Sequence, residues 1–377
     1  MRAIICAAGT AGHINPALSI ANTIMEKEPG SEILFIGTTY GLENDLVPRA
    51  GYNFKQIEAY GFKKQISFTN FKHIIQTFAS TGKVRKIIRE FKPDVVIGTG
   101  GYVCVPVMRA AIKENIKTVV HESNAFPGMA IKMFDGKASK ILVGFEKTRD
   151  NFNHKDNVIY VGNPTKMKDI NYSKEEKEKI LNEIGLKLYN EDGSLRKTII
   201  EFGGSQGAQR INDATTDLII SKKGTKLGYN LIWAIGPKQY DKYVNIFKEN
   251  DIDIEKDDEI KVFNYIYNME ELLNVADFAI TRAGAMTITE LSIVGIPAIF
   301  IPLPSRNANK QVDNAKIFEK ANAGKIILNS DITKDTLEEK ITSMLDSNLE
   351  EMSKNAKKLA PSNVLDKIYD EILTILK

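Results

Sequence analysis

Short apolar runs alternate with longer amphipathic segments along the first part of the chain. The runs are rich in Ile and Val and stop at glycine or a polar cluster, which is typical of strands buried on both faces. Helical patterns such as 16–28 and 71–91 lie between several of them, so the order predicts β-α-β units and a parallel sheet. The predicted strands are 2–8, 32–37, 94–100, 117–123 and 140–145.

The same pattern restarts in the second part of the chain, and both series begin with a strand that runs into glycines. The fold class is therefore α/β, with two Rossmann-like domains of similar size. We place the first domain at 1–164 and the second at 165–359, and we expect the amphipathic tail, about 360–377, to pack back on the first. The second series of predicted strands is 197–204, 229–236, 259–266, 277–284 and 297–304.

Ligands of open parallel sheets bind beyond the carboxyl ends of the strands, so the glycine turns after the strands are the places to look for chemistry. The first turn reads Gly9-Thr10-Ala11-Gly12-His13. A helix expected to start near Pro16 would direct free N–H groups at this turn. His13 is then a candidate general base, since histidine titrates near neutral pH. The alternative is a tight turn with His13 as an ordinary cap.

Two further turns follow in the first domain. The stretch "GTGGYVCVP" (98–106) has three glycines in four residues, which indicates unusual backbone angles or a close approach; the alternative is a mobile loop. The stretch "HESNAFPGMA" (121–130) places His121, Glu122 and Asn124 at a strand end. On its own, this stretch favours a turn with local Asn and Glu hydrogen bonds.

The second domain carries two candidate nucleotide-binding turns. In "FGGSQGAQRIN" (202–212), glycines and the Ser205 hydroxyl before a helix form an anion cradle for a diphosphate. In "TRAGAMTITELSIVGIPAIFIP" (281–302), a helix opens at Gly284, and Glu290 lies on the side of Met286, where a carboxylate suits sugar hydroxyls. A capping box from Thr287 to Glu290 is the alternative.

The segment 61–92 holds eight Lys or Arg residues and one acidic residue, Glu90, interleaved with apolar side chains. Such a basic amphipathic surface suits an anionic membrane interface. The alternative is a core-facing helix with a solvated basic back, and nucleic-acid binding is a weaker third reading because no recognition motif accompanies it. The candidate membrane residues are Ile66, Phe68, Phe71, Ile74, Ile75 and Phe78.

Composition narrows the functional class. A length of 377 residues suits two domains, and 43% apolar with 26% charged residues is ordinary for soluble globular protein. A net charge of +3 gives no reason to expect a nucleic-acid partner. Two cysteines make no disulfide framework, and the four histidines lack ligand spacing, so we expect no structural zinc. The amino terminus does not read as a signal peptide, and no apolar run has transmembrane length.

Taken together, six motifs occur in a fixed order: G-T-x-G-H, G-G-Y, H-E-x-N-A, G-N-P, G-G-S-Q-G-A and R-x-G-A-x-T-x-x-E. Across nearly the whole chain this set resembles glycosyltransferase family 28, and within it the UDP-N-acetylglucosamine transferases that form lipid II of bacterial peptidoglycan. The resemblance implies a GT-B fold, in which two Rossmann-like domains face each other across a cleft. It also implies an inverting hexosyltransferase that moves GlcNAc from UDP-GlcNAc to the muramyl 4-hydroxyl of lipid I, without a metal or another cofactor.

The resemblance also implies roles for individual residues. His13 would be the base near the acceptor, and Asn124 would contact the donor sugar. Glu290 would bind the ribose hydroxyls. The other implied substrate-binding residues are Thr10, Ala11 and Gly12 at the junction with the donor, Ser205 and Gln206 at the diphosphate, Ile266 at uracil, Ala285, Met286, Thr287, Ile288 and Thr289 around the nucleotide, and Gln311 at the GlcNAc hydroxyls.

Two positions depart from the family pattern. Lys166 stands where the family often has Arg, which keeps the charge but loses the bidentate fork for a phosphate. Lys310 precedes Gln311 where His or Gln is usual.

The resemblance implies partners and a place in the cell as well. The acceptor would be an undecaprenyl-diphosphate-linked muramyl-pentapeptide, and the protein would lie peripherally on the anionic cytoplasmic face of the bacterial cell membrane. It would serve cell-wall biogenesis, and with it cell shape, cell division and the cell cycle. Another GT-B enzyme, such as a glycolipid synthase or a UDP-sugar epimerase, and a non-enzymatic UDP-sugar sensor are the alternatives.

Overall fold

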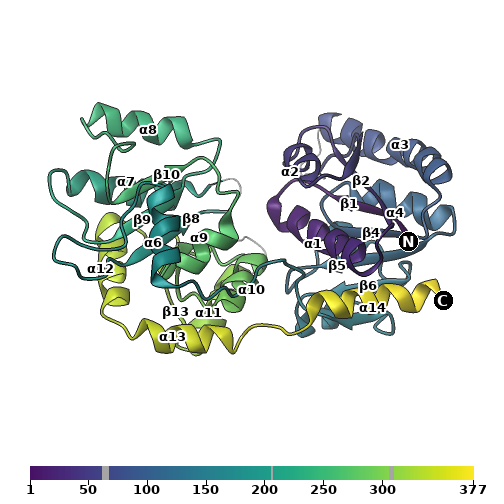
Figure 1. The fold of residues 1–377 in the computed structure, drawn as a ribbon. Helices are drawn as coiled ribbons and strands as arrows, with labels where there is room; N and C mark the ends of the chain where they lie inside the picture. The colour runs from purple at the N-terminus through teal and green to yellow at the C-terminus, as the bar shows by residue number, and fades with distance from the viewer. Residues whose placement is uncertain (62–67, 205–206, 305–309) are drawn as a thin grey trace. The chain divides into compact units, whose positions relative to one another are not determined.

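The computed structural model describes residues 1–377 except 62–67, 205–206 and 305–309 (Figure 1). The side chains of 68–72, 74, 78 and 310 also lie outside the description. The chain divides into two compact units, each with its own core. Unit 1 comprises Met1–Lys166 and Pro361–Lys377, and unit 2 comprises Met167–Ala360.

Unit 1 is built on a seven-stranded sheet in which all neighbouring strands are parallel, in the order β3-β2-β1-β4-β5-β6-β7. Its strands are β1 (Arg2–Ala7), β2 (Glu32–Thr38), β3 (Asn53–Ile57), β4 (Val95–Gly100), β5 (Lys117–Glu122), β6 (Lys140–Val143) and β7 (Val158–Tyr160). Its helices are α1 (Ala11–Lys27), α2 (Glu43–Arg49), α3 (Phe68–Phe91), α4 (Cys104–Lys113), α5 (Met129–Lys132), the 3-10 helix η1 (Glu146–Asn151) and α14 (Val364–Leu376).

Side chains from alternate positions of the central strands fill two cores, one on each face of this sheet. Ile4 and Cys6 of β1 point to the face covered by α3, α4 and α5, whereas Ala3 and Ile5 point to the face covered by α1 and α14. Because both faces are covered, the strands read as continuous apolar runs. The carboxy-terminal helix α14 packs against α1 and β5, as the yellow helix in Figure 1 shows.

Unit 2 repeats the design with a six-stranded parallel sheet in the order β10-β9-β8-β11-β12-β13. Its strands are β8 (Thr198–Phe202), β9 (Asn230–Ala234), β10 (Ile260–Phe263), β11 (Phe278–Thr281), β12 (Ala298–Phe300) and β13 (Gly324–Ile326). Its helices are α6 (Lys174–Glu183), α7 (Gln209–Ser221), α8 (Tyr240–Glu249), α9 (Met269–Val275), α10 (Ala285–Val294), α11 (Lys310–Lys320), α12 (Lys334–Leu345) and α13 (Leu349–Lys357).

The ten predicted strands are all present, and the prediction of two parallel α/β halves is confirmed. The predicted start of the first helix near Pro16 is wrong, because α1 begins at Ala11 and contains Pro16. Pro16 cannot donate a hydrogen bond to the carbonyl of Gly12, yet the helix continues through it to Lys27. His13 therefore lies in the first turn of α1 and not in a loop before the helix.

Candidate active-site turns of the two units

The turn from β1 into α1 presents backbone N–H groups at the carboxyl edge of the unit 1 sheet. Gly9 has a φ of +98°, a conformation that favours glycine. Thr10 is the N-cap residue but makes no capping hydrogen bond with its side chain. Since the first N–H groups of a helix have no partner within the helix, those of Ala11 and Gly12 are suited to binding an anion.

Three bonds and contacts fix the position of His13. Its Nδ1 lies 3.1 Å from the carbonyl oxygen of Ala8, and the Thr99 hydroxyl donates to the His13 carbonyl at 2.7 Å. A carbonyl only accepts, so the neutral imidazole carries its proton on Nδ1 and leaves Nε2 as an acceptor. The ring packs on Gly100, where a Cβ would lie 2.5 Å from His13 Cδ2. The close approach expected in 98–106 is confirmed.

Glu43, the first residue of α2, is a buried residue that contacts the turn from β1 into α1, and the sequence analysis missed it. Its carboxylate is fully buried and accepts hydrogen bonds from Gly9 N at 3.0 Å, from Thr38 N at 2.9 Å and from the Thr38 hydroxyl. Glycines at 37 and 41 leave the space it occupies. The only sequence signal was an acidic residue after a strand, which ordinarily indicates a helix start.

The end of β5 has the local hydrogen bonds expected from its Asn and Glu residues. Buried Glu122 accepts from Asn124 N at 2.8 Å, from Asn124 Nδ2 at 2.9 Å and from Gly128 N at 2.7 Å, which holds the exposed Asn124 in place. His121 is fully buried, with Nε2 2.9 Å from the Gly162 carbonyl oxygen. Burial lowers the pKa of His121 to about 4, against the opposing effect of that hydrogen bond. His121 is therefore a neutral structural residue.

In unit 2, the turn from β11 into α10 is the most fully described candidate nucleotide site. The N-cap residue of α10 is Gly284, which offers no side chain, so the N–H groups of the first turn are open to an anion. The alternative of a capping box from Thr287 to Glu290 is wrong, because Thr287 lies inside the helix. Of the predicted residues here, four are buried and two, Thr287 and Glu290, are half-buried; the buried ones are Ala285, Met286, Ile288 and Thr289.

Two side chains that the sequence reading did not single out brace this turn. Arg282 is nearly buried and donates from one nitrogen to the Ile301 carbonyl at 2.8 Å and to Asn329 Oδ1 at 2.7 Å. Its burial lowers the pKa of the guanidinium to about 10, so it stays charged at neutral pH. Asn314 Nδ2 donates to the Ala283 carbonyl at 3.0 Å. These bonds tie the turn to the segments after β12 and β13.

The turn from β8 into α7 contains Ser205 and Gln206, which lie outside the described residues. The residues beside them are described: Gly207 has a φ of +75°, and a Cβ there would lie 2.3 Å from the Ile235 carbonyl oxygen. Asn212 of α7 donates to that same carbonyl at 2.9 Å. The strand–glycine–helix arrangement expected of an anion cradle is present around the undescribed pair.

The remaining predicted binding residues differ in how deeply they are buried and in their hydrogen bonds. Ile266 is buried in the unit 2 core, and Lys166 is exposed at the last residue of the first segment of unit 1. Gln311 accepts a hydrogen bond from Leu303 N at 2.9 Å. The neighbouring Lys310 side chain lies outside the description.

The helix α3 divides the predicted membrane surface into two parts. Its second half is a core-facing helix, as the alternative interpretation held: Val84, Ile87 and Ile88 are buried, and Arg85 and Arg89 form ion pairs with Glu114. Ile75 is 52% exposed. Ile66 and the side chains of Phe68, Phe71, Ile74 and Phe78 lie outside the described part of the chain.

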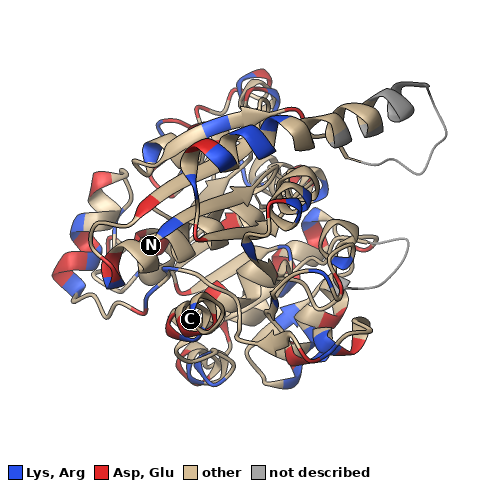
Figure 2. Ribbon diagram, turned by 90° about the vertical axis from the view of Figure 1, so that its right-hand side faces the viewer, with Lys and Arg blue, Asp and Glu red and all other residues tan. Residues whose placement is uncertain are grey.

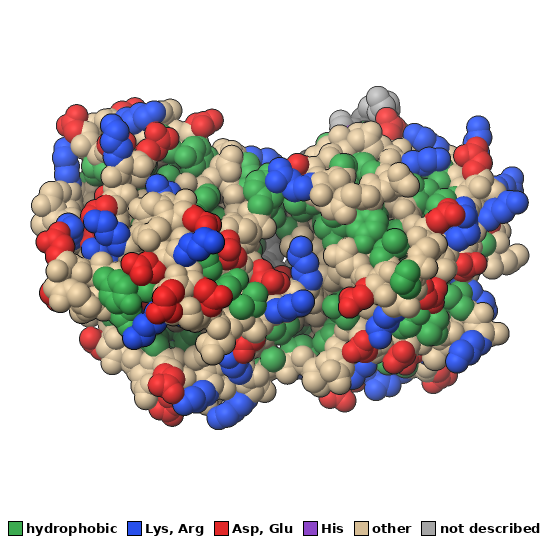
Figure 3. Space-filling view, in the orientation of Figure 1, with side chains coloured by type: hydrophobic (Ala, Val, Ile, Leu, Met, Phe, Trp, Pro, Cys, Tyr) green, Lys and Arg blue, Asp and Glu red, His purple; other side chains and the backbone are tan. Residues whose placement is uncertain are grey.

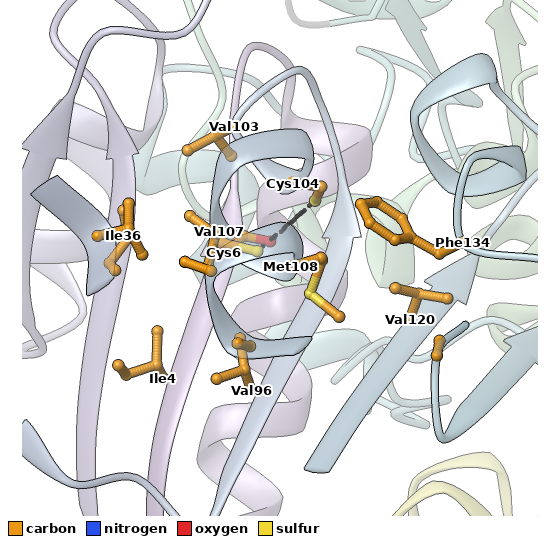
Figure 4. Close-up of a cluster of buried hydrophobic side chains, with 14 of the residues drawn as sticks. Ile4, Cys6, Ile36, Val96, Val103, Cys104, Val107, Met108, Val120 and Phe134 are labelled. Carbon is orange, nitrogen blue, oxygen red and sulfur yellow. Dashed lines mark hydrogen bonds between the residues drawn. The ribbon is translucent and has the colours of Figure 1, made fainter. Parts of the chain in front are cut away.

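On the face of each unit that Figure 3 presents, acidic and basic side chains are interspersed, and the ribbon in Figure 2 shows acidic and basic residues along both units. Within the described ranges, no helix is long and apolar enough to cross a membrane. The same ranges contain no group of three His, Cys, Asp or Glu residues that could hold a metal ion. Cys6 and Cys104 are free thiols buried beneath the turns, with Sγ atoms 3.7 Å apart (Figure 4). Burial raises the pKa of the Cys6 thiol.

Comparison with known proteins decides the family. The model of the glycosyltransferase family 28 N-terminal domain matches residues 3–143, and that of the glycosyltransferase family 28 C-terminal domain matches residues 198–368. The chain belongs to glycosyltransferase family 28. The resemblance seen in the six ordered motifs is thereby confirmed.

Proteins with similar sequences match this family 28 chain along its full length. A protein of Acetivibrio thermocellus is 40% identical over 379 residues, covering 100% of this chain and 99% of its own. A protein of Thermoanaerobacter sp. is 38% identical over 377 residues, which cover 100% of this chain and 100% of its own. Both are named UDP-N-acetylglucosamine–N-acetylmuramyl-(pentapeptide) pyrophosphoryl-undecaprenol N-acetylglucosamine transferase.

Solved structures show the same fold. Acinetobacter baumannii MurG matches with a TM-score of 0.67 at 24% identity over 99% of each chain. A UDP co-structure of S. aureus MnaA matches with a TM-score of 0.65 at 12% identity, covering 100% of this chain and 97% of the other. The family 28 chain therefore has the GT-B fold, as expected.

Proposed function

We propose that this family 28 chain is an inverting hexosyltransferase that moves GlcNAc from UDP-GlcNAc to the muramyl 4-hydroxyl of an undecaprenyl-diphosphate-linked muramyl-pentapeptide, forming lipid II for peptidoglycan. The observation that carries the proposal is full-length identity of 38–40% to relatives named for this transfer. Cell-wall biogenesis, and with it cell shape and division, is the process that such a product serves.

His13 supplies the base in this proposal. Its Nδ1–H is engaged by the Ala8 carbonyl, so Nε2 accepts the proton of the muramyl 4-hydroxyl. The hydroxyl oxygen then attacks the anomeric carbon of GlcNAc from the face opposite the diphosphate. The bond from that carbon to the diphosphate oxygen breaks, and UDP leaves with the electron pair, so the anomeric configuration inverts.

Unit 2 stabilises the charge on the departing UDP. The α10 amino terminus has no capping side chain, and the α7 amino terminus follows a glycine turn in the same way. Unsatisfied N–H groups at helix amino termini stabilise a phosphate. Glu290 is half-buried one turn into α10, which suits a bond to the ribose hydroxyls.

The other substrate contacts follow from the family resemblance. Asn124 meets the donor sugar, and Glu122 fixes its side chain. The exposed Lys166 contributes charge toward a phosphate. We assign the remaining contacts to Thr10, Ala11 and Gly12 at the acceptor junction, Ser205 and Gln206 at the diphosphate, Ile266 at uracil, Ala285, Met286, Thr287, Ile288 and Thr289 around the nucleotide, and Gln311 at the GlcNAc hydroxyls.

A lipid-linked acceptor calls for peripheral attachment to the anionic cytoplasmic face of the membrane. In the sequence, the first half of α3 and the segment before it hold the apolar and basic residues for this contact. Among the candidate membrane residues, Ile75 is the one whose side chain the structure describes, and it is exposed. We expect salt-sensitive binding to anionic liposomes. If the protein binds no liposomes at any salt concentration, the segment has only the structural role of a core-facing helix with a solvated basic back.

The transfer itself is tested with radiolabelled UDP-GlcNAc and a lipid I analogue. We expect label in the lipid product and one UDP released for each product formed. Formation of an epimer of the donor without acceptor would instead favour a UDP-sugar epimerase. Donor binding with no turnover on any acceptor would favour a sensor.

A further inference from the structure

We propose that Glu43 is a positioning residue that acts on the catalytic base His13 through the single peptide group joining Ala8 to Gly9. The kinetic part of this proposal rests on the function proposed above. The geometric part concerns unit 1 alone.

The two hydrogen bonds that define this connection lie on opposite ends of one peptide group. Gly9 N–H donates to Glu43 Oε2 at 3.0 Å, and the Ala8 carbonyl accepts from His13 Nδ1 at 3.1 Å. Hydrogen bonds in a chain polarise one another. A carboxylate on the N–H end therefore makes the carbonyl oxygen a stronger acceptor for the imidazole proton.

The carboxylate end of the connection is rigid. Glu43 has no exposed surface, and its three donors are Gly9 N, Thr38 N and the Thr38 hydroxyl. An ionised carboxylate is an acceptor only, and three converging donors match that character. A Cβ at Gly41 would lie 1.9 Å from Glu43 Oε2, so this side chain fits only because residue 41 is glycine.

The imidazole end is confined as well. A Cβ at Gly101, which has a φ of +85°, would lie 2.5 Å from the Ala8 carbonyl oxygen. The neighbouring Gly100 admits the His13 ring in the same way. The turns after β1, β2 and β4 thus converge on one peptide group, and hydrogen bonds to Glu43 and His13 hold its two ends.

This arrangement has a consequence for the reaction. Holding the proton on His13 Nδ1 leaves Nε2 unprotonated and oriented as an acceptor. A carboxylate that orients a histidine tautomer directly is the arrangement of the Ser-His-Asp triad. Here the peptide group stands between the two side chains. The Glu43 carboxylate also accepts the N–H of Gly9, so an anion bound at this turn would depend on the N–H groups of Ala11 and Gly12 instead.

The variant Glu43→Gln tests the connection. Its amide oxygen can still accept from Thr38, but its NH2 group then faces Gly9 N–H, and two donors meet. We expect kcat to fall about tenfold to hundredfold, the scale of a small misplacement of a catalytic group. KM for UDP-GlcNAc, which unit 2 binds, should not change.

The matched control is Glu259→Gln in unit 2. Glu259 is also a buried carboxylate that accepts two backbone N–H bonds, from Leu227 and Gly228. It lies just before β10, at the amino edge of the sheet. We expect this variant to lose stability and to keep the wild-type kcat.

The deciding readout is the ¹⁵N spectrum of protein labelled at its four histidines, assigned with His13→Ala. We expect neutral His13 to be the Nδ1–H tautomer in the wild type and to lose that preference in Glu43→Gln. An Nε2–H tautomer in the wild type overturns the proposal, whether or not the variant folds. So does a folded Glu43→Gln with wild-type kcat and wild-type ¹⁵N shifts.

The spectrum also separates this proposal from the proposed function, since it needs no turnover. If the wild type transfers no GlcNAc but shows the expected tautomer and its loss in Glu43→Gln, the function is wrong and the Glu43 connection stands.

Discussion

The two units brace their glycine turns with different chemistry. In unit 1, the buried carboxylates of Glu43 and Glu122 accept backbone N–H groups of the turns. In unit 2, the side-chain donors of Asn314, Asn212 and Arg282 bond to backbone carbonyls of the turns and adjoining segments. Besides side-chain donors to the Ala8 and His13 carbonyls, unit 1 therefore uses carboxylates that occupy N–H groups. The unit 2 bonds named here occupy carbonyls only and leave N–H groups for a ligand.

The difference corresponds to the two parts of the proposed reaction. A base needs a fixed orientation and an acceptor nitrogen, which a carboxylate held behind a peptide group provides. A departing diphosphate needs donors, and neutral amides or a cation can brace the backbone beside it without repelling it. Variants at the unit 1 turns should therefore change the orientation of the base, and variants at the unit 2 turns should change binding of the donor.

Replacing His13 with alanine should have the largest effect. We expect kcat to fall by roughly 10²- to 10⁴-fold, the usual contribution of a general base. The dissociation constant for UDP-GlcNAc, measured by calorimetry, should stay near the wild-type value. His154→Ala is the control, because His154 is an exposed histidine of unit 1 paired with Asp135. Equal losses of turnover and donor binding in His13→Ala would count against a base.

The stability of the two units should depend on pH in opposite directions. Burial raises the pKa of Glu201 to about 8, so the folded state keeps a proton that the unfolded chain releases, and unit 2 loses stability as pH rises from the ordinary glutamate range to about 8. His121, with its pKa lowered to about 4, resists protonation when folded, so unit 1 loses stability as pH falls from the ordinary histidine range toward 4.

Urea unfolding followed by Trp233 measures the first of these effects, because the only tryptophan of the chain lies in β9 of unit 2, paired with Glu201. We expect a change of a few kcal/mol in the wild type between about pH 5 and about pH 9 and a flatter profile in Glu201→Gln. A wild-type midpoint that does not move with pH would contradict a neutral buried Glu201.

Replacing Gly100 with alanine should displace the His13 ring, since the new Cβ would lie 2.5 Å from it and the backbone has a φ of +127°. We expect kcat to fall about tenfold to hundredfold with the donor dissociation constant unchanged. Gly224→Ala is the control for backbone strain, because Gly224 has a φ of +80° and open space around the added methyl. The interpretation fails if both variants lose the same activity.

The smallest effect should come from Asn314→Leu in unit 2. It leaves the Ala283 carbonyl without its side-chain partner, which costs about 1–3 kcal/mol in a buried turn. We expect KM for UDP-GlcNAc to rise about tenfold with little change in kcat. Asn274→Leu removes bonds to Lys168 and Glu270 and should leave that KM unchanged. A fall in kcat without a rise in KM would contradict the proposal that unit 2 binds the donor while unit 1 orients the base.

The sequence identified every interior strand of the two sheets and one edge strand, β10, and missed the other three edge strands. β3, β7 and β13 are each the last strand at an end of a sheet. In β3, the exposed and half-exposed positions break the apolar run, and β7 and β13 have three residues each. Periodicity reports burial, so an edge strand with one open side leaves a weak signal.

By itself, the sequence determined the two parallel α/β halves, the positions of the glycine turns and the family, because apolar periodicity and ordered motifs are local properties of the chain. Only the tertiary structure decided which residues meet at each turn. Glu43 lies 34 positions after Gly9, and Gly100 lies 87 positions after His13. Such contacts form where parallel strands end at one sheet edge, and no local pattern records which side chain will fill the space beside a glycine.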